Sequence, residues 1–303
     1  MSQVKSSPTE NTLAVLFHSP SFKCLPKHFE RIGNALEILQ MERRVPAIFG
    51  DLESENYFFN KDIVSRSPGI KACRDAHKDQ PAVLVCAGPS LDDVIPYLGR
   101  IGKHCVLACV DTALPVLSRE GIYPQYVFSL DPQDESFLYF RTDLDNPAKL
   151  VYLPTASARV VNSYRGEKIV VCKEGHELFK DNLELLNEKG TTQAGGSVSC
   201  FGIDCLRQMG CNPIVMAGQD CAFSGNRTYS RHAIMNESLL DKIYLFKTLA
   251  TQHMEKMQES KMIQVECQGG QKVFTNQMMY SYLRNIEALA LCGIPARVAS
   301  GSL

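Results

Sequence analysis

Residues 81–91, with the sequence PAVLVCAGPSL, decide the fold class of this chain. The apolar run at 83–85 is typical of a buried strand, and it stops at the turn Gly88-Pro89-Ser90. The next segment, LDDVIPYL, has the pattern of a helix. A turn of this kind lets a ligand approach the backbone, and the first N–H groups of the helix favour anions. The turn is therefore either a nucleotide cradle or an ordinary connecting loop.

Strands and helices alternate along the chain after this unit. The strand-like runs lie at 82–86, 105–110, 126–130, 149–154, 168–172 and 213–218, with helical segments between most of them. Alternation at this spacing is typical of a mostly parallel sheet that helices cover on both faces. We therefore predict an α/β fold: a three-layer Rossmann-like domain over residues 75–303, with a small N-terminal element over residues 1–74.

Composition limits the classes of function. The chain has 303 residues, of which 45% are apolar, enough for a sizeable core, and its net charge is −1. The charge gives no electrostatic reason to expect a nucleic-acid partner. The N-terminus does not have the pattern of a signal peptide, and no apolar run reaches the length of a membrane span. We expect a cytoplasmic protein.

Twelve cysteines raise the question of disulfides or metal. They are scattered, many of them inside apolar runs, and no CxxC pair occurs. The pairs at 105/109 and 200/205 have no histidine at zinc-finger spacing. Because free cysteine is common in the cores of proteins from reducing compartments, we predict reduced core thiols and no metal site.

A second glycine turn, Gly195-Gly196-Ser197, introduces an amphipathic helix. Two glycines allow a backbone shape that other residues resist, which favours contact with a ligand. Ser197 has an equally simple interpretation as a helix N-cap. Neither glycine turn has the Walker pattern or the GxGxxG fingerprint, so any nucleotide site here is of another kind.

Polar side chains follow several predicted strands, namely Asp111, Asp131, Gln219 and Asp220. Because parallel strands end at one edge of a sheet, these residues should gather where open α/β sheets bind ligands. A carboxylate in such a place caps a helix or braces a loop, or it holds a ribose hydroxyl or a divalent cation. The sequence leaves these alternatives open.

His232 is the histidine best placed for acid–base chemistry. It lies in RTYSRHA, soon after the strand that ends before Asp220, and Tyr229 is a second polar candidate in the same loop. Histidine is the natural general base at neutral pH. We therefore predict His232 and Asp220 as catalytic residues.

Several of these segments together resemble the motility accessory factor (Maf) family. They are CAGPSL at 86–91, VDTALPVLSREGIYPQYVFSLD at 110–131, GGSV at 195–198 and MAGQDCAF at 216–223. The lead-in NYFFNKDIVSRSPGIKAC at 56–73 is also similar, so the likeness covers roughly residues 56–292. The same domain resembles the archaeal 6-hydroxymethylpterin diphosphokinase and, more distantly, bacterial sialyltransferases.

The Maf resemblance implies a nucleotide-sugar glycosyltransferase. The donor substrate would be a CMP-activated nonulosonic acid of the pseudaminic or legionaminic type, the acceptor a Ser or Thr of a protein such as flagellin, with no firm cofactor. Gly88, Pro89, Ser90, Gly195, Gly196 and Ser197 would cradle the nucleotide. Asp111 would belong to the same cleft, Asp131, Gln219 and Asp220 would orient the sugar or ribose, and His232 would deprotonate the acceptor.

Two alternatives remain. The likeness to the pterin enzyme implies diphosphate transfer from ATP with Mg²⁺, in which Asp111, Asp131 and Asp220 become metal ligands or their supports. The third alternative is a non-catalytic, nucleotide-binding accessory protein that keeps the cleft without the chemistry.

Overall fold

The computed structural model describes residues 30–193, 196–237, 248–258, 262–267, 270–291 and 297–298. By its contacts the chain divides into two compact units, Met1–Arg44 and Val45–Leu303. The second unit holds the sheet and every candidate site residue. The predicted division between residues 74 and 75 stays a prediction, although residues 45–74 group with the sheet in this structure.

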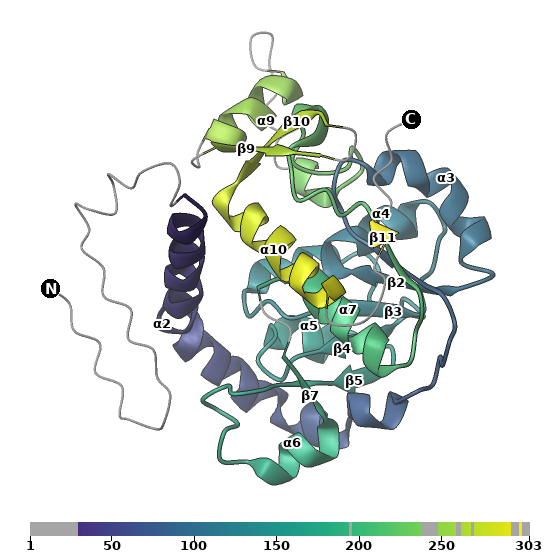
Figure 1. Cartoon of the computed structure of the whole chain (residues 1–303). Helices are drawn as coiled ribbons and strands as arrows, with labels where there is room; N and C mark the ends of the chain where they lie inside the picture. Colours follow the sequence, from purple (N-terminus) through teal and green to yellow (C-terminus); the bar gives the residue numbers. More distant parts are fainter. Residues whose placement is uncertain are drawn as a thin grey trace, which may run out of the picture. The chain divides into compact units, whose positions relative to one another are not determined.

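A parallel sheet forms the centre of the second unit (Figure 1). Its strand order is β11-β8-β1-β2-β3-β4-β5, and every neighbouring pair is parallel. The strands are β1 (Ala82–Val85), β2 (Val106–Val110), β3 (Tyr126–Ser129), β4 (Lys149–Tyr152), β5 (Lys168–Val170), β8 (Ile214–Ala217) and β11 (Arg297–Val298). The six strands predicted from apolar runs are confirmed, each within a few residues of its predicted bounds.

The register brings three strand ends to one level. Val85 of β1 pairs with Cys109 of β2 on one side and with Ala217 of β8 on the other. The residues after β1, β2 and β8 therefore leave the sheet at the same carboxyl edge. Strand order reverses between β1 and β8, the kind of place where doubly wound sheets bind ligands.

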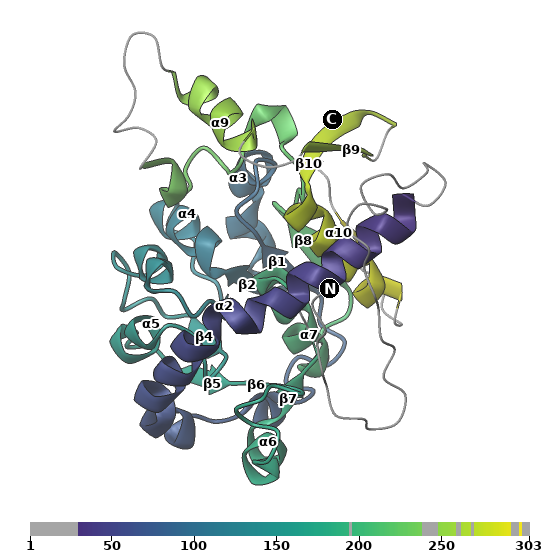
Figure 2. The same ribbon diagram turned by 90° about the vertical axis from the view of Figure 1, so that its left-hand side faces the viewer.

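Helices cover both faces of this sheet. In Figure 2, α4 and α5 lie on one side of the strands and α7 lies on the other. α7 approaches the strands closely, because a Cβ on its Gly202 would lie only 3.0 Å from the Phe128 ring and 3.1 Å from Leu84. The helices of this part are α3 (Leu91–Ile101), α4 (Leu114–Arg119), α5 (Ala158–Ser163), α6 (Leu183–Lys189) and α7 (Val198–Gln208). The predicted three-layer α/β fold is confirmed.

Helix α2 (Glu30–Arg66) contributes its second half to the same unit. The helix ends just before Pro68, as expected because the residue preceding a proline disfavours helical geometry. Asn56 donates to the carbonyl oxygen of Pro132 at 2.7 Å and accepts from the amide of Ala158 at 3.0 Å. Asn60 donates to the carbonyl oxygens after β4 in the same way. These two buried amides fix the loops that follow β3 and β4.

The C-terminal elements attach to the loop after β8. Strands β9 (Met262–Glu266) and β10 (Lys272–Asn276) form an antiparallel pair, and the Thr275 hydroxyl donates to the carbonyl oxygen of Cys221 at 2.7 Å. Helix α10 (Gln277–Leu291) then packs against α7. The remaining elements are α9 (Leu249–Gln258), β6 (Cys172–Lys173), β7 (Thr191–Thr192) and the 3-10 helices at Ile70–Cys73, Asp111–Ala113, Asp134–Tyr139, Ser224–Asn226 and Ile234–Asn236.

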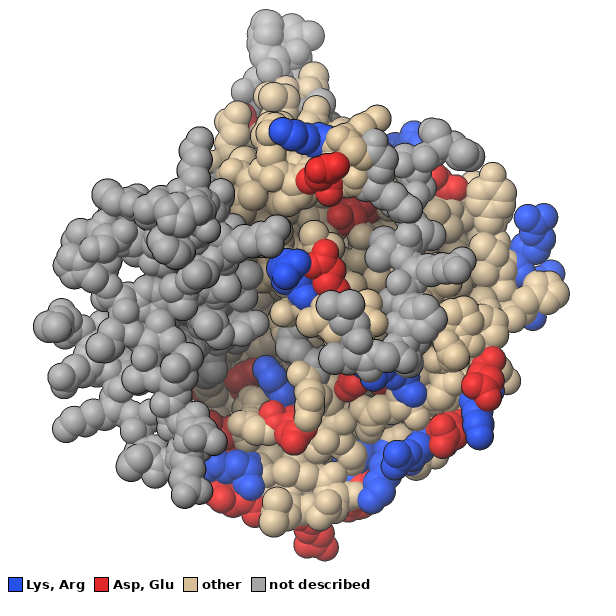
Figure 3. All heavy atoms as spheres, viewed as in Figure 1, with Lys and Arg blue, Asp and Glu red and all other residues tan. Residues whose placement is uncertain are grey.

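The cysteines behave as core residues. The ten cysteines among the described residues are free thiols, and seven of them are buried. Burial raises the pKa of the Cys86, Cys109 and Cys205 thiols well above the usual value, so these groups stay protonated and unreactive. Among the described residues, no helix combines the length and apolar character that crossing a membrane requires. On the face in Figure 3, acidic and basic side chains lie next to one another over the described surface.

Candidate active site

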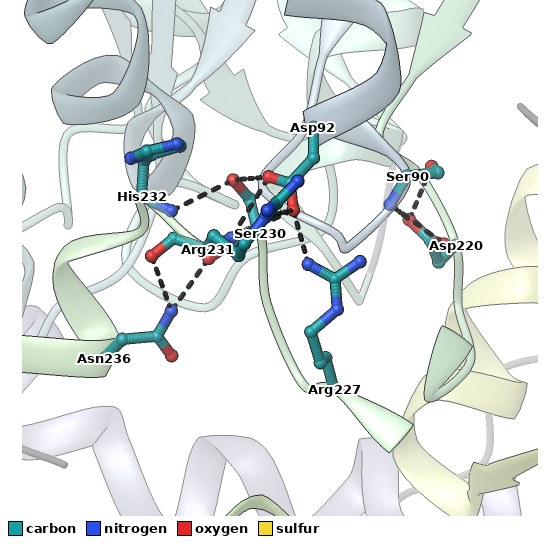
Figure 4. Close-up of polar contacts among 8 residues, drawn as sticks. All are labelled: Ser90, Asp92, Asp220, Arg227, Ser230, Arg231, His232 and Asn236. Carbon is teal, nitrogen blue, oxygen red and sulfur yellow. Dashed lines mark hydrogen bonds and ion pairs between the residues drawn. The ribbon is translucent and has the colours of Figure 1, made fainter. Parts of the chain in front are cut away.

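The turn that opens α3 is in contact with Asp220. The amide of Ser90 donates to both Asp220 carboxylate oxygens, at 3.2 and 3.3 Å, and the Ser90 hydroxyl donates to Oδ2 at 2.8 Å (Figure 4). The next three amides of the helix donate to carbonyl oxygens within the turn, at 3.0 to 3.3 Å. A carboxylate of the protein thus takes the position that a helix N-terminus offers to an anion.

Two glycines allow this contact. A Cβ on Gly88 would lie 2.3 Å from Asp220 Oδ2, and a Cβ on Gly218 would lie 2.2 Å from the carbonyl oxygen of Cys86. The amide of Gly88 also donates to the carbonyl oxygen of Gly218 at 2.8 Å. The close approach expected at Gly88 is therefore made by the loop after β8. That Gly88, Pro89 and Ser90 cradle a nucleotide stays a prediction, and a ligand there must replace Asp220.

Asp111 follows β2 and is fully buried. Its Oδ2 accepts from the Ser129 hydroxyl at 2.8 Å, and its Oδ1 accepts from the amide of Thr112 at 2.8 Å. Burial, and after it the negative charge of Asp131, raises the pKa of Asp111 to about 7, although both hydrogen bonds favour the charged form. This carboxyl can therefore hold a proton near neutral pH.

Asp131 lies one strand further along the sheet, after β3, and is open to solvent. Its backbone carbonyl accepts from the amide of Ser157 at 2.9 Å, which fixes the loop. Protein around the carboxyl partly desolvates it and raises its pKa as well. Because the charges of Asp111 and Asp131 interact, the two carboxyls titrate as a coupled pair. One member of the pair is buried and the other is exposed.

The charge of this pair acts on three tyrosine phenols: Tyr139 before β4, Tyr229 in the loop after β8 and Tyr282 in α10. The Tyr139 hydroxyl donates to Met235 Sδ at 3.2 Å. All three are half-buried. Burial first, and then nearby carboxylate charge, raises the pKa of each phenol, to about 12 for Tyr282. The hydroxyls therefore stay protonated at neutral pH and remain hydrogen-bond donors. Sequence reasoning identified Tyr229 but missed Tyr139 and Tyr282, because nothing local marks residues that meet only through the fold.

The second glycine turn lies at the same edge of the sheet. Helix α7 packs against β1 and β8 and directly precedes β8 in the chain, so its first turn lies at the edge where β8 ends. Ser197 caps α7, since its Oγ accepts from the amide of Cys200 at 3.2 Å. The cap interpretation of Ser197 is thereby confirmed.

Gly196 adjoins the tyrosine group. Its φ is +87°, and a Cβ there would lie 2.8 Å from Asn285 Nδ2 and 3.8 Å from the Tyr282 ring. Gly196 thus borders the site through α10. Gly195 lies outside the described residues, so its predicted contact with a nucleotide stays a prediction.

Asp92, the second residue of α3, fixes the loop after β8. Its carboxylate accepts from the Ser230 hydroxyl at 2.6 Å, from the amide and Nε of Arg231 at 3.1 Å each, and from the Arg227 guanidinium (Figure 4). The side chain is only 3% exposed. Burial opposes its ionisation, but these hydrogen bonds outweigh burial and lower the pKa of Asp92. Sequence reasoning missed this residue, because its partners lie far along the chain.

His232 and Gln219 lie outside the carboxylate–tyrosine group. His232 is exposed, and in Figure 4 its ring points away from Asp92 and Asp220. Within the described part of the chain, no hydrogen-bond or ion-pair partner orients the imidazole. Gln219 donates to the Cys221 thiol at 3.0 Å. The predicted catalytic roles of His232 and Asp220 and the predicted sugar contact of Gln219 stay predictions.

Comparison with known proteins supplies a family. Residues 55–226, more than half of the chain, match the family described as 6-hydroxymethylpterin diphosphokinase MptE-like. The chain belongs to this MptE-like family. The match begins within α2 and ends in the loop after β8, so it contains Asp92, Asp111, Asp131 and Asp220.

A solved structure extends the likeness of this MptE-like chain. The Maf glycosyltransferase from Magnetospirillum magneticum AMB-1 is similar with a TM-score of 0.53 and 16% sequence identity. The likeness covers 76% of this chain and 35% of the Maf chain, and at this identity it concerns the fold. No protein of curated function matches the sequence.

The fit of this MptE-like site to a metal ion depends on two carboxylates. In the parts of the chain that the structure describes, no three His, Cys, Asp or Glu side chains come together as ligands. Asp220, predicted as a possible third ligand, is bound to Ser90 instead. Asp111 and Asp131 remain, and Mg²⁺ is commonly held by one or two carboxylates together with substrate phosphates. The residues thus fit Mg²⁺ only when a phosphate ligand completes the set.

Replacing Asp111 by asparagine should change how stability depends on pH. Because the folded-state pKa of Asp111 is raised to about 7, its ionisation costs stability as pH rises from about 4 to about 7. The variant lacks this cost, so its melting temperature should exceed that of wild type by about 5 °C at pH 8. The difference should shrink toward pH 5, which thermal melts at both pH values measure. An equal difference at both pH values would contradict the raised pKa.

Proposed function

We propose that this chain transfers a group from an activated nucleotide to a hydroxyl acceptor, and that the group is a sugar. The observation that carries the proposal is the Asp111–Asp131 pair, two carboxyls that follow neighbouring parallel strands at the carboxyl edge of the sheet and whose charge reaches the phenols of Tyr229 and Tyr282. A general base that activates a hydroxyl near neutral pH needs a pKa near 7. Burial and the charge of Asp131 raise the pKa of Asp111 to about 7, and burial raises the pKa of Asp131 above its ordinary value as well.

The proposed mechanism assigns the accessible carboxyl to the acceptor. Asp131 takes the proton of the acceptor hydroxyl, whose oxygen bonds to the anomeric carbon as the bond from that carbon to the phosphate oxygen breaks. Asp111 shares the proton and sets the pKa of the pair. The hydroxyls of Tyr229 and Tyr282 donate to the departing phosphate, which stabilises the leaving group in a partly buried site.

The charge around the loop after β8 fits an anionic donor. Arg227 and Arg231 share the Asp92 carboxylate, and Arg119 and Arg141 share Glu237. Each group has two guanidiniums for one carboxylate and is therefore net positive. A CMP-activated nonulosonic acid carries a phosphate and a carboxylate, so it is the donor we propose. The fold is similar to that of a Maf glycosyltransferase, and the acceptor we propose is a protein hydroxyl such as that of flagellin.

A second candidate is diphosphate transfer from ATP to a hydroxymethylpterin. The family description favours it, and Asp111 and Asp131 would hold Mg²⁺ with the ATP phosphates. This reaction also deprotonates a hydroxyl, but carboxylates that hold Mg²⁺ cannot take that proton at the same time. The two candidates differ in the nucleotide and in the need for the metal.

A thermal-shift experiment separates the candidates. Stabilisation by CMP or a CMP-sugar without metal supports the glycosyltransferase, and CMP release in the presence of flagellin then tests turnover. Stabilisation only by ATP with Mg²⁺ supports the diphosphokinase. Binding of a nucleotide without turnover in either assay would support the non-catalytic accessory protein, and no binding at millimolar concentration would contradict all three.

Gly196→Val should weaken nucleotide binding by at least about tenfold while the fold persists. A β-branched side chain resists the φ of +87° and would enter the space beside Tyr282. The nearest atom is the end of the flexible Asn285 side chain, which can move, so global unfolding is not expected. Thermal shift with and without CMP measures both effects, and unchanged binding by the folded variant would remove Gly196 from the proposed site.

A further inference from the structure

We propose that Asp92 is a positioning residue: it fastens residues 227–231, here called the latch loop, to α3 and so fixes the position of Tyr229 in the middle of that loop. The attachment of the latch loop to Asp92 does not depend on the function of the protein. Its effect on catalysis rests on the function proposed above, because that effect requires Tyr229 to act on the substrate.

One buried carboxylate holds both ends of the latch loop. Arg227 at its start and Arg231 at its end both pair with Asp92, whose side chain is 3% exposed. Between them, the Ser230 hydroxyl donates to Asp92 Oδ1 at 2.6 Å. Charge-assisted hydrogen bonds to a shielded carboxylate are among the stronger polar contacts in proteins. Removing Asp92 therefore removes side-chain contacts of three loop residues together, while the Asn236 amide still donates to the carbonyl oxygens of Ser230 and Arg231, at 2.8 and 3.2 Å.

The backbone next to Tyr229 is fastened as well. The amide of Ser230 donates to the carbonyl oxygen of Ala87 at 2.9 Å, directly after β1. On the other side, the Thr228 hydroxyl lies 3.0 Å from His253 Nδ1 of α9. Tyr229 therefore occupies the middle of a loop whose two neighbouring residues are tied to different elements, and its ring packs against the core.

These ties fix the backbone on both sides of Tyr229. Burial raises the pKa of the Tyr229 phenol, and the charges of Asp131 and Asp111 add to this. Asp92 does not itself belong to the acid–base group. Its action on the reaction must therefore pass through the loop and through Tyr229.

Limited trypsin digestion tests the latch without any substrate. Trypsin cleaves after arginine, so Arg227 and Arg231 report directly on whether the loop is open. We expect slow cleavage at both sites in wild type and at least about tenfold faster cleavage in Asp92→Ala. Asp93→Ala is the matched control, because Asp93 is an exposed carboxylate in the same helical turn, and it should be cleaved like wild type. Equal cleavage of Asp92→Ala and wild type would overturn the latch.

A milder variant guards against loss of the fold. Ser230→Ala removes the 2.6 Å hydrogen bond to Asp92 and a longer one, at 3.4 Å, from the amide of His232, and it keeps both trypsin sites. It should be cleaved at a rate between those of wild type and Asp92→Ala, with an unchanged circular dichroism spectrum. If Asp92→Ala does not fold, cleavage of Ser230→Ala at the wild-type rate would overturn the proposal.

A double-mutant cycle tests the positioning role in the active protein. Tyr229→Phe should lower kcat while the loop stays closed to trypsin, whereas Asp92→Ala should lower kcat and open the loop. If Asp92 acts through Tyr229, the double variant should lose no more kcat than the worse single variant. Losses in kcat that multiply would show that Asp92 does not act through Tyr229. If no donor supports turnover, the trypsin result still decides the latch, so its failure and that of the proposed function remain distinguishable.

Discussion

Asp131→Asn is expected to lower the rate of group transfer by about 100- to 1000-fold while the protein stays folded. The substitution keeps the size of the side chain and removes its ability to take a proton. Because Asp131 is open to solvent and only its backbone carbonyl fixes the loop, the fold should tolerate the change. Steady-state release of CMP from a CMP-activated donor measures the rate, and thermal melting checks the fold.

Two further variants make this result specific. Glu135→Gln removes another exposed carboxylate of the same loop and should retain the wild-type rate. His232→Gln removes the histidine that the sequence favours as base. A larger loss in His232→Gln than in Asp131→Asn would return the role of base to His232. In wild type the rate should rise with pH through the pKa of the Asp111–Asp131 pair, and this dependence should disappear in Asp131→Asn.

The layers of the fold could be predicted because they depend on local pattern. The strands of a parallel sheet are buried on both faces, so runs such as Val106–Val110 are apolar throughout and visible in the sequence. Turn residues such as Pro68 and Gly88 then mark where the elements end. Local sequence pattern does not show which residues far apart in the chain come into contact. Asn56 and Asn60 read as ordinary helical residues, yet their hydrogen-bond partners lie 76 to 102 residues away.

The candidate site divides in the same way. Asp111 and Asp131 could be predicted as neighbours because both follow parallel strands, and strand ends share an edge. The hydrogen-bond partners of two other carboxylates, Asp220 and Asp92, could not be predicted. Asp220 binds Ser90 across 130 residues, and Asp92 binds Ser230 across 138. Both contacts depend on how the loop after β8 folds back over α3, which no single stretch of sequence encodes.

Gly218→Ala should lower the free energy of unfolding by about 3 kcal/mol or more. Gly218 has a φ of +72°, where an L-residue with a Cβ is strained, and its new Cβ would lie 2.2 Å from the carbonyl oxygen of Cys86. That oxygen belongs to the backbone directly after β1, so it cannot rotate away as a side chain does. The backbone after β8 must therefore move away from the backbone after β1, and this overpacking lowers the free energy of unfolding further. Urea denaturation measures the loss.

Gly121→Ala separates the two causes. Gly121 also has a positive φ, of +66°, but nothing lies within 4 Å of its new Cβ. Both substitutions restrict the unfolded chain equally, so the difference between their unfolding free energies measures the close contacts of the new Cβ with Cys86 and with Leu91, whose Cβ lies at 2.9 Å. We expect a loss of about 1 kcal/mol for Gly121→Ala. Equal losses for the two variants would mean that the ends of β1 and β8 can separate at little cost. In that case Asp220, which follows Gly218, could move away from Ser90 at little cost, and a phosphate could take its place at the N-terminus of α3.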